Sequence, residues 1–206
     1  MKLKIGIFLS LTVLAACIVG FALPWYDIRV DHVFGDDQNK ATFKWQNYVC
    51  EDTGDSDSKT TIKYTENGSC LPIITLNKLS EVAKIMNTCL SFLTIGAALA
   101  LGTALLQLVI FLSPKLCRSC VWKLLCIGCS IASIVTLFIS FFTIFGLPKA
   151  FDDDSNGINI CQDRWCDKIY GSDDDTKWMP GGGWFATLVA CFLALCSGIF
   201  TLASHR

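Results

Sequence analysis

ALPWY, at residues 22–26, is the point at which an uncharged run of 22 residues after Lys4 ends and a long polar segment begins. A helix needs roughly 20 apolar residues to cross about 30 Å of hydrocarbon, so this run is long enough to span a bilayer. Further uncharged runs of 30, 25 and 27 residues follow Lys84, Lys123 and Lys177. Because lipid offers backbone groups no hydrogen-bond partners, we expect each run to be helical.

Composition also places the chain among membrane proteins. Of its 206 residues 52% are hydrophobic, and a mean hydropathy of +0.49 is high for a soluble domain. We predict an all-α membrane fold, in which four transmembrane helices form a bundle and the first outer segment forms a small antiparallel extracellular β-sheet. The predicted boundaries are a cytosolic amino terminus at 1–4, helices at 5–24, 83–113, 124–148 and 181–204, outer segments at 25–82 and 149–180, a cytosolic loop at 114–123 and a cytosolic tail at 205–206.

Charge is distributed unevenly along the chain. All 18 acidic residues lie at 27–81 or 152–175, whereas the amino terminus, the segment after the second run and the carboxyl end carry basic residues and no acid. Basic residues next to membrane helices favour the cytosol. We therefore predict a multi-pass plasma-membrane protein with both termini cytosolic and both acidic segments outside. Nothing in this charge pattern indicates a nucleic-acid partner.

Four of the twelve cysteines lie in the predicted outer segments: Cys50, Cys70, Cys161 and Cys166. An oxidising compartment and an even count predict two disulfides, for which three pairings are possible. We favour Cys50 with Cys70 and Cys161 with Cys166, because each bond would close within one segment. The sequon at 67–69 predicts N-glycosylation of Asn67 in a eukaryotic cell.

The first outer segment has the alternation typical of β-strands. Phe43 and Trp45 alternate with polar residues, and so do Ile62 and Tyr64. This pattern predicts two half-buried strands, with the polar run 51–58 as the turn between them. A disulfide from Cys50 to Cys70 would pin the resulting unit.

The apolar runs contain small and polar residues but no charge away from their ends. The second run places small residues four apart in two series, Gly96, Ala100 and Ala104, and Ala98 and Gly102. Such spacing predicts close helix packing inside a bundle, and Asn87 and Gln107 are predicted to form interhelical hydrogen bonds. Proton relays, coupled transporters and voltage sensors usually need charged residues within their spans, so this sequence argues against those functions.

The first run has an alternative interpretation as a cleaved signal. Residues 14–17, LAAC, match a bacterial lipoprotein cleavage site, at which Cys17 would carry the lipid. Because residues 18–23 stay apolar and complete a full span, we favour a retained helix.

Two C-x-x-C pairs lie near the predicted cytosolic loop, Cys117 with Cys120 and Cys126 with Cys129. Four thiolates at such spacing can bind zinc or an iron–sulfur cluster, but the second pair falls inside an apolar helix. We favour palmitoylation of Cys117 or Cys120 and simple packing of the second pair. A membrane thiol–disulfide oxidoreductase is a further alternative, although these pairs lie at the cytosolic end.

The second outer segment contains a sequence similar to a calcium loop. Asp152, Asp154, Asn156 and Asp163 fall at loop positions one, three, five and twelve, with a glycine at position six. Calcium prefers such oxygen ligands. Pro148 interrupts the preceding helix in this interpretation, and a solvated acidic loop is the simpler one. We therefore expect no required cofactor, with calcium as the possible ligand.

The pattern resembles the claudin superfamily, which includes the peripheral myelin protein. The resemblance rests on the ALPWY exit with Trp25, on Trp45 followed by Cys50, on Cys70, and on a basic residue, Lys84, at the start of the second span. The Trp45-to-Cys50 spacing is longer than the family's. The resemblance implies a four-helix bundle under a small extracellular sheet, to which the second outer segment adds a strand.

These observations lead to one favoured function and two alternatives. The favoured function is a non-enzymatic tetraspan that makes lateral or cell-to-cell contacts in adhesion or junctions, with itself as a homo-oligomer or with other membrane proteins. The first alternative is a pore-forming or auxiliary subunit for ion passage, in which the acidic segments attract cations. The second is the thiol oxidoreductase, whose turnover would depend on Cys161 or Cys166.

Overall fold

The computed structural model describes residues 2–31, 38–52, 58–71, 74–76, 78–113, 120–154, 168–173 and 176–203. The chain divides into two compact units. The helical unit comprises Met1–Ala22, Leu90–Phe142 and Phe185–Arg206, and the sheet unit comprises Leu23–Cys89 and Thr143–Trp184. Each unit is described by itself.

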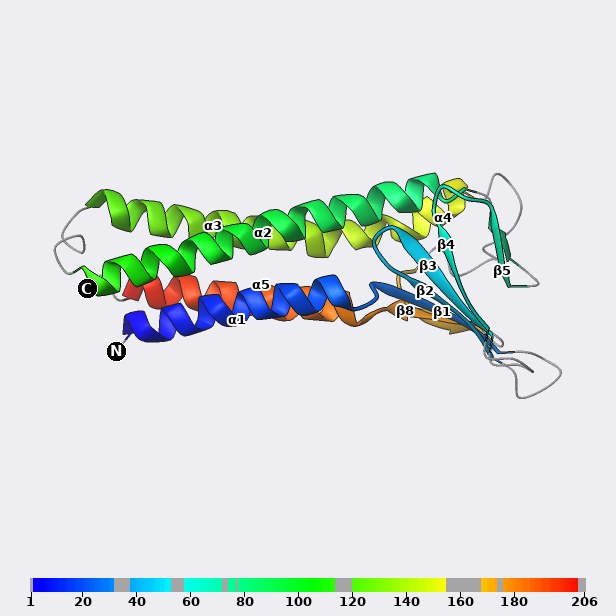
Figure 1. The fold of residues 1–206 in the computed structure, drawn as a ribbon, viewed down its shortest axis with the longest axis horizontal. Coiled ribbons are helices and arrows are strands. Elements are labelled where there is room, and N and C mark those ends of the chain that lie inside the picture. Colours follow the sequence, from blue (N-terminus) through cyan, green and yellow to red (C-terminus); the bar gives the residue numbers. More distant parts are fainter. Residues whose placement is uncertain are drawn as a thin grey trace. The chain divides into compact units, whose positions relative to one another are not determined.

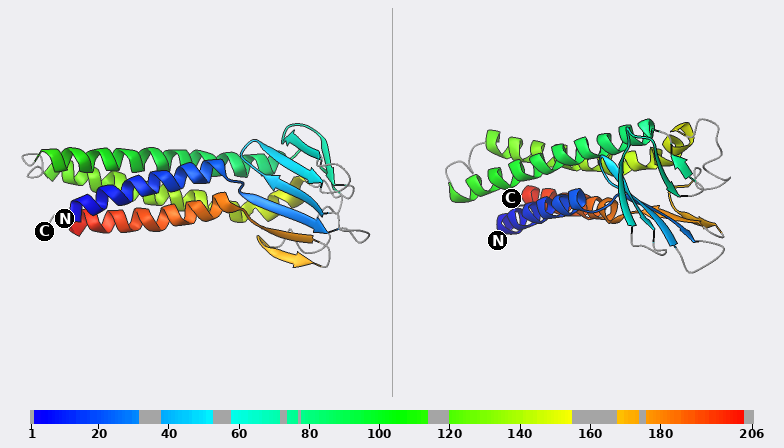
Figure 2. Two further views of the ribbon diagram at one scale, coloured as in Figure 1. Left: turned by 60° about the horizontal axis from the view of Figure 1, so that its bottom comes forward. Right: turned by 45° about the vertical axis from the view of Figure 1, so that its right-hand side comes forward.

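Four helical stretches are long and apolar enough to cross a membrane, as the uncharged runs predict. They cover Leu3–Ala22, Ser80–Leu112, Leu124–Asp154 and Gly182–Ala203. The helices themselves are α1 (Lys2–Ala22), α2 (Ser80–Leu112), α3 (Cys120–Thr143) and α5 (Gly182–Ala203). A 3₁₀ turn, η2 (Ile144–Gly146), joins α3 to the short helix α4 (Leu147–Asp154). In Figure 1 and Figure 2, the parts of α1, α2, α3 and α5 within the helical unit run side by side.

Helical structure in the third stretch extends six residues beyond the predicted end at 148. Pro148 is the second residue of α4, where a missing backbone N–H costs little because the first helical turn has no intrahelical acceptor for it. The proline therefore does not end the helical stretch, and residues 149–154 are helical rather than part of a loop.

Small residues on α2 allow close packing inside the helical unit. Gly96, Ala100 and Ala104 are buried, and a Cβ on Gly96 would lie 2.7 Å from Cδ2 of Leu137 on α3. Ala98 is exposed, and the space beside Gly102 is open. The first predicted series therefore packs against a neighbouring helix, whereas the second does not.

The sheet unit contains an antiparallel six-stranded sheet in the order β4-β3-β2-β1-β8-β7. From the first polar segment come β1 (Tyr26–Asp31), β2 (Gln38–Phe43), β3 (Asn47–Asp52) and β4 (Ser58–Lys63). The second polar segment adds β7 (Gly171–Asp173) and β8 (Thr176–Pro180), and a separate hairpin consists of β5 (Gly68–Leu71) and β6 (Ile74–Leu76). The sheet thus draws strands from both segments, whereas the prediction from alternation placed it in the first.

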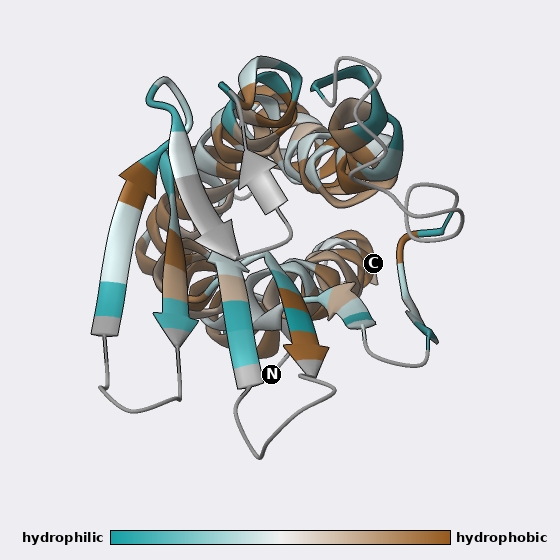
Figure 3. Ribbon diagram, turned by 90° about the vertical axis from the view of Figure 1, so that its right-hand side faces the viewer, coloured by the Kyte–Doolittle hydropathy of each residue, from teal (hydrophilic) through white to brown (hydrophobic). Residues whose placement is uncertain are grey.

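Hydrophobic and hydrophilic residues alternate along strands of the sheet, as the hydropathy colouring in Figure 3 shows. Tyr26, Ile28 and Val30 of β1 are buried, and Arg29 between them is exposed. This is the period of two that a half-buried strand requires. Trp45 lies between β2 and β3 rather than on a strand, so the predicted strand through Phe43 ends two residues earlier.

Candidate functional site

The packed face of the sheet is built around one row of residues that crosses five strands. Ile62, Tyr48, Phe43, Tyr26 and Pro180 are directly opposite one another on β4, β3, β2, β1 and β8. The Phe43 and Tyr48 rings stack at 5.6 Å between centroids. Cross-strand aromatic pairs each stabilise a sheet by roughly 0.2–1 kcal/mol. This row, which we call the aromatic row, stabilises the pairing of the five strands that it crosses.

Trp25 joins the two polar segments immediately before β1. Its side chain is fully buried and lies against Trp45, with ring centroids 4.4 Å apart. Its backbone N–H donates to the carbonyl of Phe43 at 2.9 Å, and its carbonyl accepts from the N–H of Gly181 at 2.8 Å. Trp25 and Trp45, two of the residues on which the sequence resemblance rests, are therefore in contact.

Gly181 and Gly183 are required by the close packing around Pro24 and Trp25. A Cβ on Gly181 would lie 2.4 Å from the carbonyl oxygen of Pro24, and one on Gly183 would lie 2.5 Å from the Trp25 indole. Atoms other than hydrogen do not approach so closely without a bond. The glycine run therefore serves close packing, a role that its composition alone did not indicate.

The residues before β7 are held by two side chains of the sheet. The Tyr26 hydroxyl donates to the carbonyl of Ile169 at 3.0 Å, and the Trp178 indole N–H donates to the carbonyl of Lys168, also at 3.0 Å. Both side chains are buried. Residues 168–169 are thus fixed by the first and second polar segments together.

Asp154, one of the predicted calcium ligands, occupies the amino end of α2. Its side-chain oxygens accept hydrogen bonds from the backbone N–H groups of Glu81 and Val82, at 3.0 Å each, and from the Ser80 hydroxyl at 3.1 Å. A carboxylate there satisfies N–H groups that have no intrahelical partner and complements the positive end of the helix dipole. Asp154 is 5% exposed, so its observed role is to cap a helix.

The calcium prediction itself stays a prediction. Asp152 is exposed, and Asn156 and Asp163 lie outside the described residues. Among the residues that the structure describes, no group of three or more His, Cys, Asp or Glu side chains is placed to hold a metal ion.

The opposite face of the sheet carries a row of charged residues, which we call the charged row. It consists of Lys59, Glu51, Lys40, Arg29 and Lys177, directly opposite one another across β4, β3, β2, β1 and β8. Lys59 pairs with Glu51 at 3.0 Å, and Lys40 lies 3.6 Å from Asp27. Four basic groups and one acid thus cross a sheet whose two parent segments are acidic in sum.

Like charges that face each other across strands destabilise a sheet. Arg29 is directly opposite both Lys40 and Lys177, an arrangement that sheet stability alone does not favour. The Lys59 hydrogen bond and the nearby Lys40 and Lys44 charges lower the pKa of Glu51. The sequence showed the net charge of each segment, but the strand register was needed to bring these side chains into one row.

Burial changes the acidity of the tyrosines on the packed face. It raises the pKa of Tyr48 to about 12 and also raises those of Tyr26 and Tyr64, because an apolar environment disfavours the phenolate. The Tyr64 hydroxyl donates to the Lys44 carbonyl. The Tyr48 hydroxyl is buried without a hydrogen-bond partner among the described residues.

Cys50 is buried on β3, opposite Thr60 of β4, and it is bonded in a disulfide rather than free. The side chain of Cys70 on β5 lies outside the described part of the chain, so the pairing of Cys50 with Cys70 stays a prediction. Asn67 is exposed just before β5, and Lys84 on α2 forms an ion pair with Glu81.

The other predicted site residues are not described. Cys117, Cys161 and Cys166 lie outside the described residues, and Cys120 begins α3 without a described side chain. The lipidation prediction and the second disulfide therefore stay predictions.

A scan against protein-family models finds no match to the chain, and a search of curated protein sequences finds none either.

Proposed function

We propose that the chain is a non-enzymatic, claudin-like tetraspan of the plasma membrane, which makes lateral or cell-to-cell contacts through its β-sheet. The six-stranded sheet carries this proposal. One face is fixed by the aromatic row, and the other presents the charged row on side chains that are exposed or half-buried. A rigid sheet with an available polar face and two edge strands, β4 and β7, suits protein contacts.

The membrane part of the proposal has its own support. Large apolar side chains are exposed on α1, α3 and α5, including Phe8, Val121 and Phe192. A soluble protein would bury such side chains, whereas lipid accommodates them. With both termini in the cytosol, both polar segments would lie outside the cell, where Cys50 could be oxidised and Asn67 glycosylated.

The charged row favours contacts over cation passage. The ion-passage hypothesis requires acidic outer segments to attract cations, but four of the five residues in the row are basic. Contacts made by these residues should weaken with salt and respond to charge reversal.

The test is an aggregation assay on liposomes or cells that carry the full chain. Replacing Arg29 by glutamate should reduce clustering severalfold, while the sheet stays folded because the new acid is directly opposite Lys40 and Lys177. Lys149→Glu is the matched control, since Lys149 is an exposed basic residue on α4 and does not belong to the charged row. Unchanged clustering in Arg29→Glu would refute contacts through the charged row. Cation conductance that disappears with Asp152→Asn, without loss of clustering, would favour the pore.

A further inference from the structure

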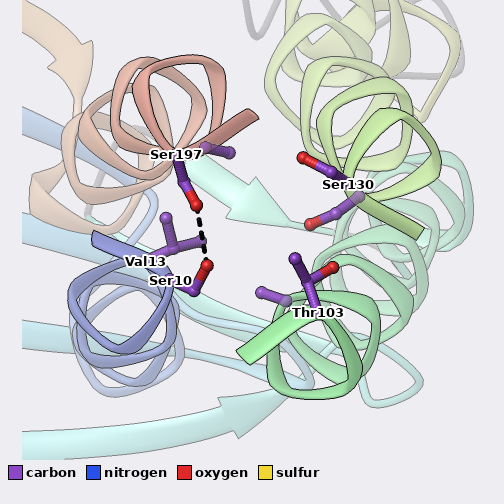
Figure 4. Close-up of a pocket in the computed structure, with 8 residues that line it drawn as sticks. Ser10, Val13, Thr103, Ser130 and Ser197 are labelled. Atoms are coloured by element: carbon purple, nitrogen blue, oxygen red, sulfur yellow. Dashed lines mark hydrogen bonds between the residues drawn. The ribbon is translucent and has the colours of Figure 1, made fainter. Parts of the chain in front are cut away.

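The interior of the helical unit contains a small cavity lined by hydroxyl groups. Its volume is about 10 Å³, and it is bordered by Ser10 of α1, Thr103 of α2, Ser130 and Ser133 of α3 and Ser197 of α5. Each of these five residues is at most 6% exposed. Figure 4 shows the labelled side chains around one common space, with the Ser10–Ser197 hydrogen bond on one side and Ser130 and Thr103 on the other. All four long helices thus contribute a hydroxyl to one point.

Most of these hydroxyl groups already have a hydrogen-bond acceptor. The Ser133 hydroxyl donates to the Gly96 carbonyl at 3.0 Å, and the Thr103 hydroxyl donates to the Leu99 carbonyl at 2.9 Å. Each of these oxygens keeps lone pairs with which to accept a further bond.

Ser10 and Ser197 belong to a connected network. Ser10 donates to the Gln107 side-chain oxygen at 3.1 Å, and Ser197 donates to the Gly6 carbonyl at 3.2 Å. The Gln107 side-chain amide in turn donates to the Thr201 hydroxyl at 2.6 Å. This confirms the prediction of interhelical hydrogen bonding by Gln107.

Ser130 is the exception. No hydrogen bond joins its hydroxyl to another residue that the structure describes, although Ser130 is only 6% exposed and lines the cavity. A buried donor without an acceptor is costly, because it has lost its bonds to water and gained none. The cavity therefore holds one unused donor and several oxygens able to accept.

We propose that this cavity binds one water molecule, which accepts a hydrogen bond from Ser130 and donates to two of the facing hydroxyl oxygens. The volume is about what one water needs, and three hydrogen bonds are the usual number for a buried water. A sodium ion would fit by size, but no carboxylate lines the cavity to balance its charge. The bound water joins α3 to the hydroxyl network of α1, α2 and α5.

The direct test uses magnetisation transfer from water to methyl groups, measured by NMR on the full chain in detergent micelles. The Val13 methyl groups line the cavity and have no protons that exchange with water. We expect a cross-peak from a long-lived water to Val13. Ile110 is the control, because it is equally buried on α2 but does not line the cavity. Absence of the Val13 signal, or an equal signal at Ile110, would overturn the proposal.

Two substitutions strengthen the test. Ser130→Val places methyl groups where the water would lie, so the Val13 cross-peak should disappear. Ser130→Ala should lower the folded-to-unfolded ratio roughly 2- to 10-fold if a water binds, whereas removal of an unpaired hydroxyl from a dry cavity would raise that ratio. If a variant fails to fold, the Val13 cross-peak measured on the unsubstituted protein still tests the proposal. A cross-peak seen in sodium chloride but not in choline chloride would assign the site to a hydrated cation and contradict a water-only site.

Discussion

The Trp25 indole lies where a side chain on Gly183 would have to be. A Cβ at that glycine would approach the indole Cδ1 and Nε1 atoms to 2.5 Å. The first residues of α5 therefore pack closely against Trp25, which follows α1, within the sheet unit.

Gly183→Ala should destabilise the sheet unit, because the buried Trp25 ring has little room to move. The expected loss is about 1–3 kcal/mol, typical of an overpacked core. Denaturant unfolding in micelles, followed by tryptophan fluorescence, measures it. Gly102→Ala is the control, since nothing lies within 4 Å of a Cβ there. It should be neutral or slightly stabilising, and equal losses in both variants would contradict this role for Gly183.

Asp154→Ala should expose the unsatisfied N–H groups at the start of α2. Loss of a helix cap costs roughly 0.5–2 kcal/mol, and burial of the site places the effect at the upper end. Amide hydrogen exchange at Glu81 and Val82 should accelerate, while Asp153→Ala, at an exposed neighbour on α4, should leave it unchanged. If calcium protected these amides in the unsubstituted protein but not in Asp154→Asn, a ligand role for Asp154 would be supported as well.

Tyr48→Phe should stabilise the protein at neutral pH. The substitution removes a buried hydroxyl that has no partner among the described residues, which relieves a cost of roughly 1–3 kcal/mol. Tyr170→Phe, at an exposed side chain, is the control. A loss of stability in Tyr48→Phe would mean that the hydroxyl is satisfied after all.

The same tyrosine predicts a pH dependence. Burial raises its folded-state pKa to about 12, while the unfolded chain ionises near pH 10. Between these values the unfolded state binds fewer protons, so the free energy of unfolding should fall as the pH rises from about 10 to 12. The slope should be shallower in Tyr48→Phe, and equal slopes would refute this assignment.

A non-reducing peptide map should recover Cys50 joined to Cys70. Alanine at either position should release the other as a free thiol and lower stability by roughly 2–4 kcal/mol. Recovery of Cys50 linked to Cys161 or Cys166 would contradict the pairing and remove one support of the claudin resemblance.

Glycosylation at Asn67 tests the orientation. In eukaryotic cells the chain should lose mass on glycosidase treatment, and Asn67→Gln should abolish the shift, because Asn67 is exposed beside the sheet. Glycosidase-insensitive protein, with a terminal tag accessible from outside intact cells, would reverse the proposed topology.

The sequence predicted the helices well because their uncharged runs are long, and the alternation around Phe43 and Ile62 located strands. It did not show that β8 pairs with β1, since strand pairing across distant segments depends on tertiary contacts. It also assigned Asp154 to a cation and did not show the packing role of Gly181 and Gly183, because composition does not reveal which atoms approach a residue.

The pairing of β1 with β8 also has a consequence for biosynthesis. These strands are roughly 150 residues apart in the sequence, so a ribosome must add all of the residues between them before the second partner of β1 exists. Until then one edge of β1 is open to aggregation, and such non-local pairing is slow. The sheet therefore cannot be completed before β8 has been synthesised, which makes late assembly steps the ones most vulnerable to quality control.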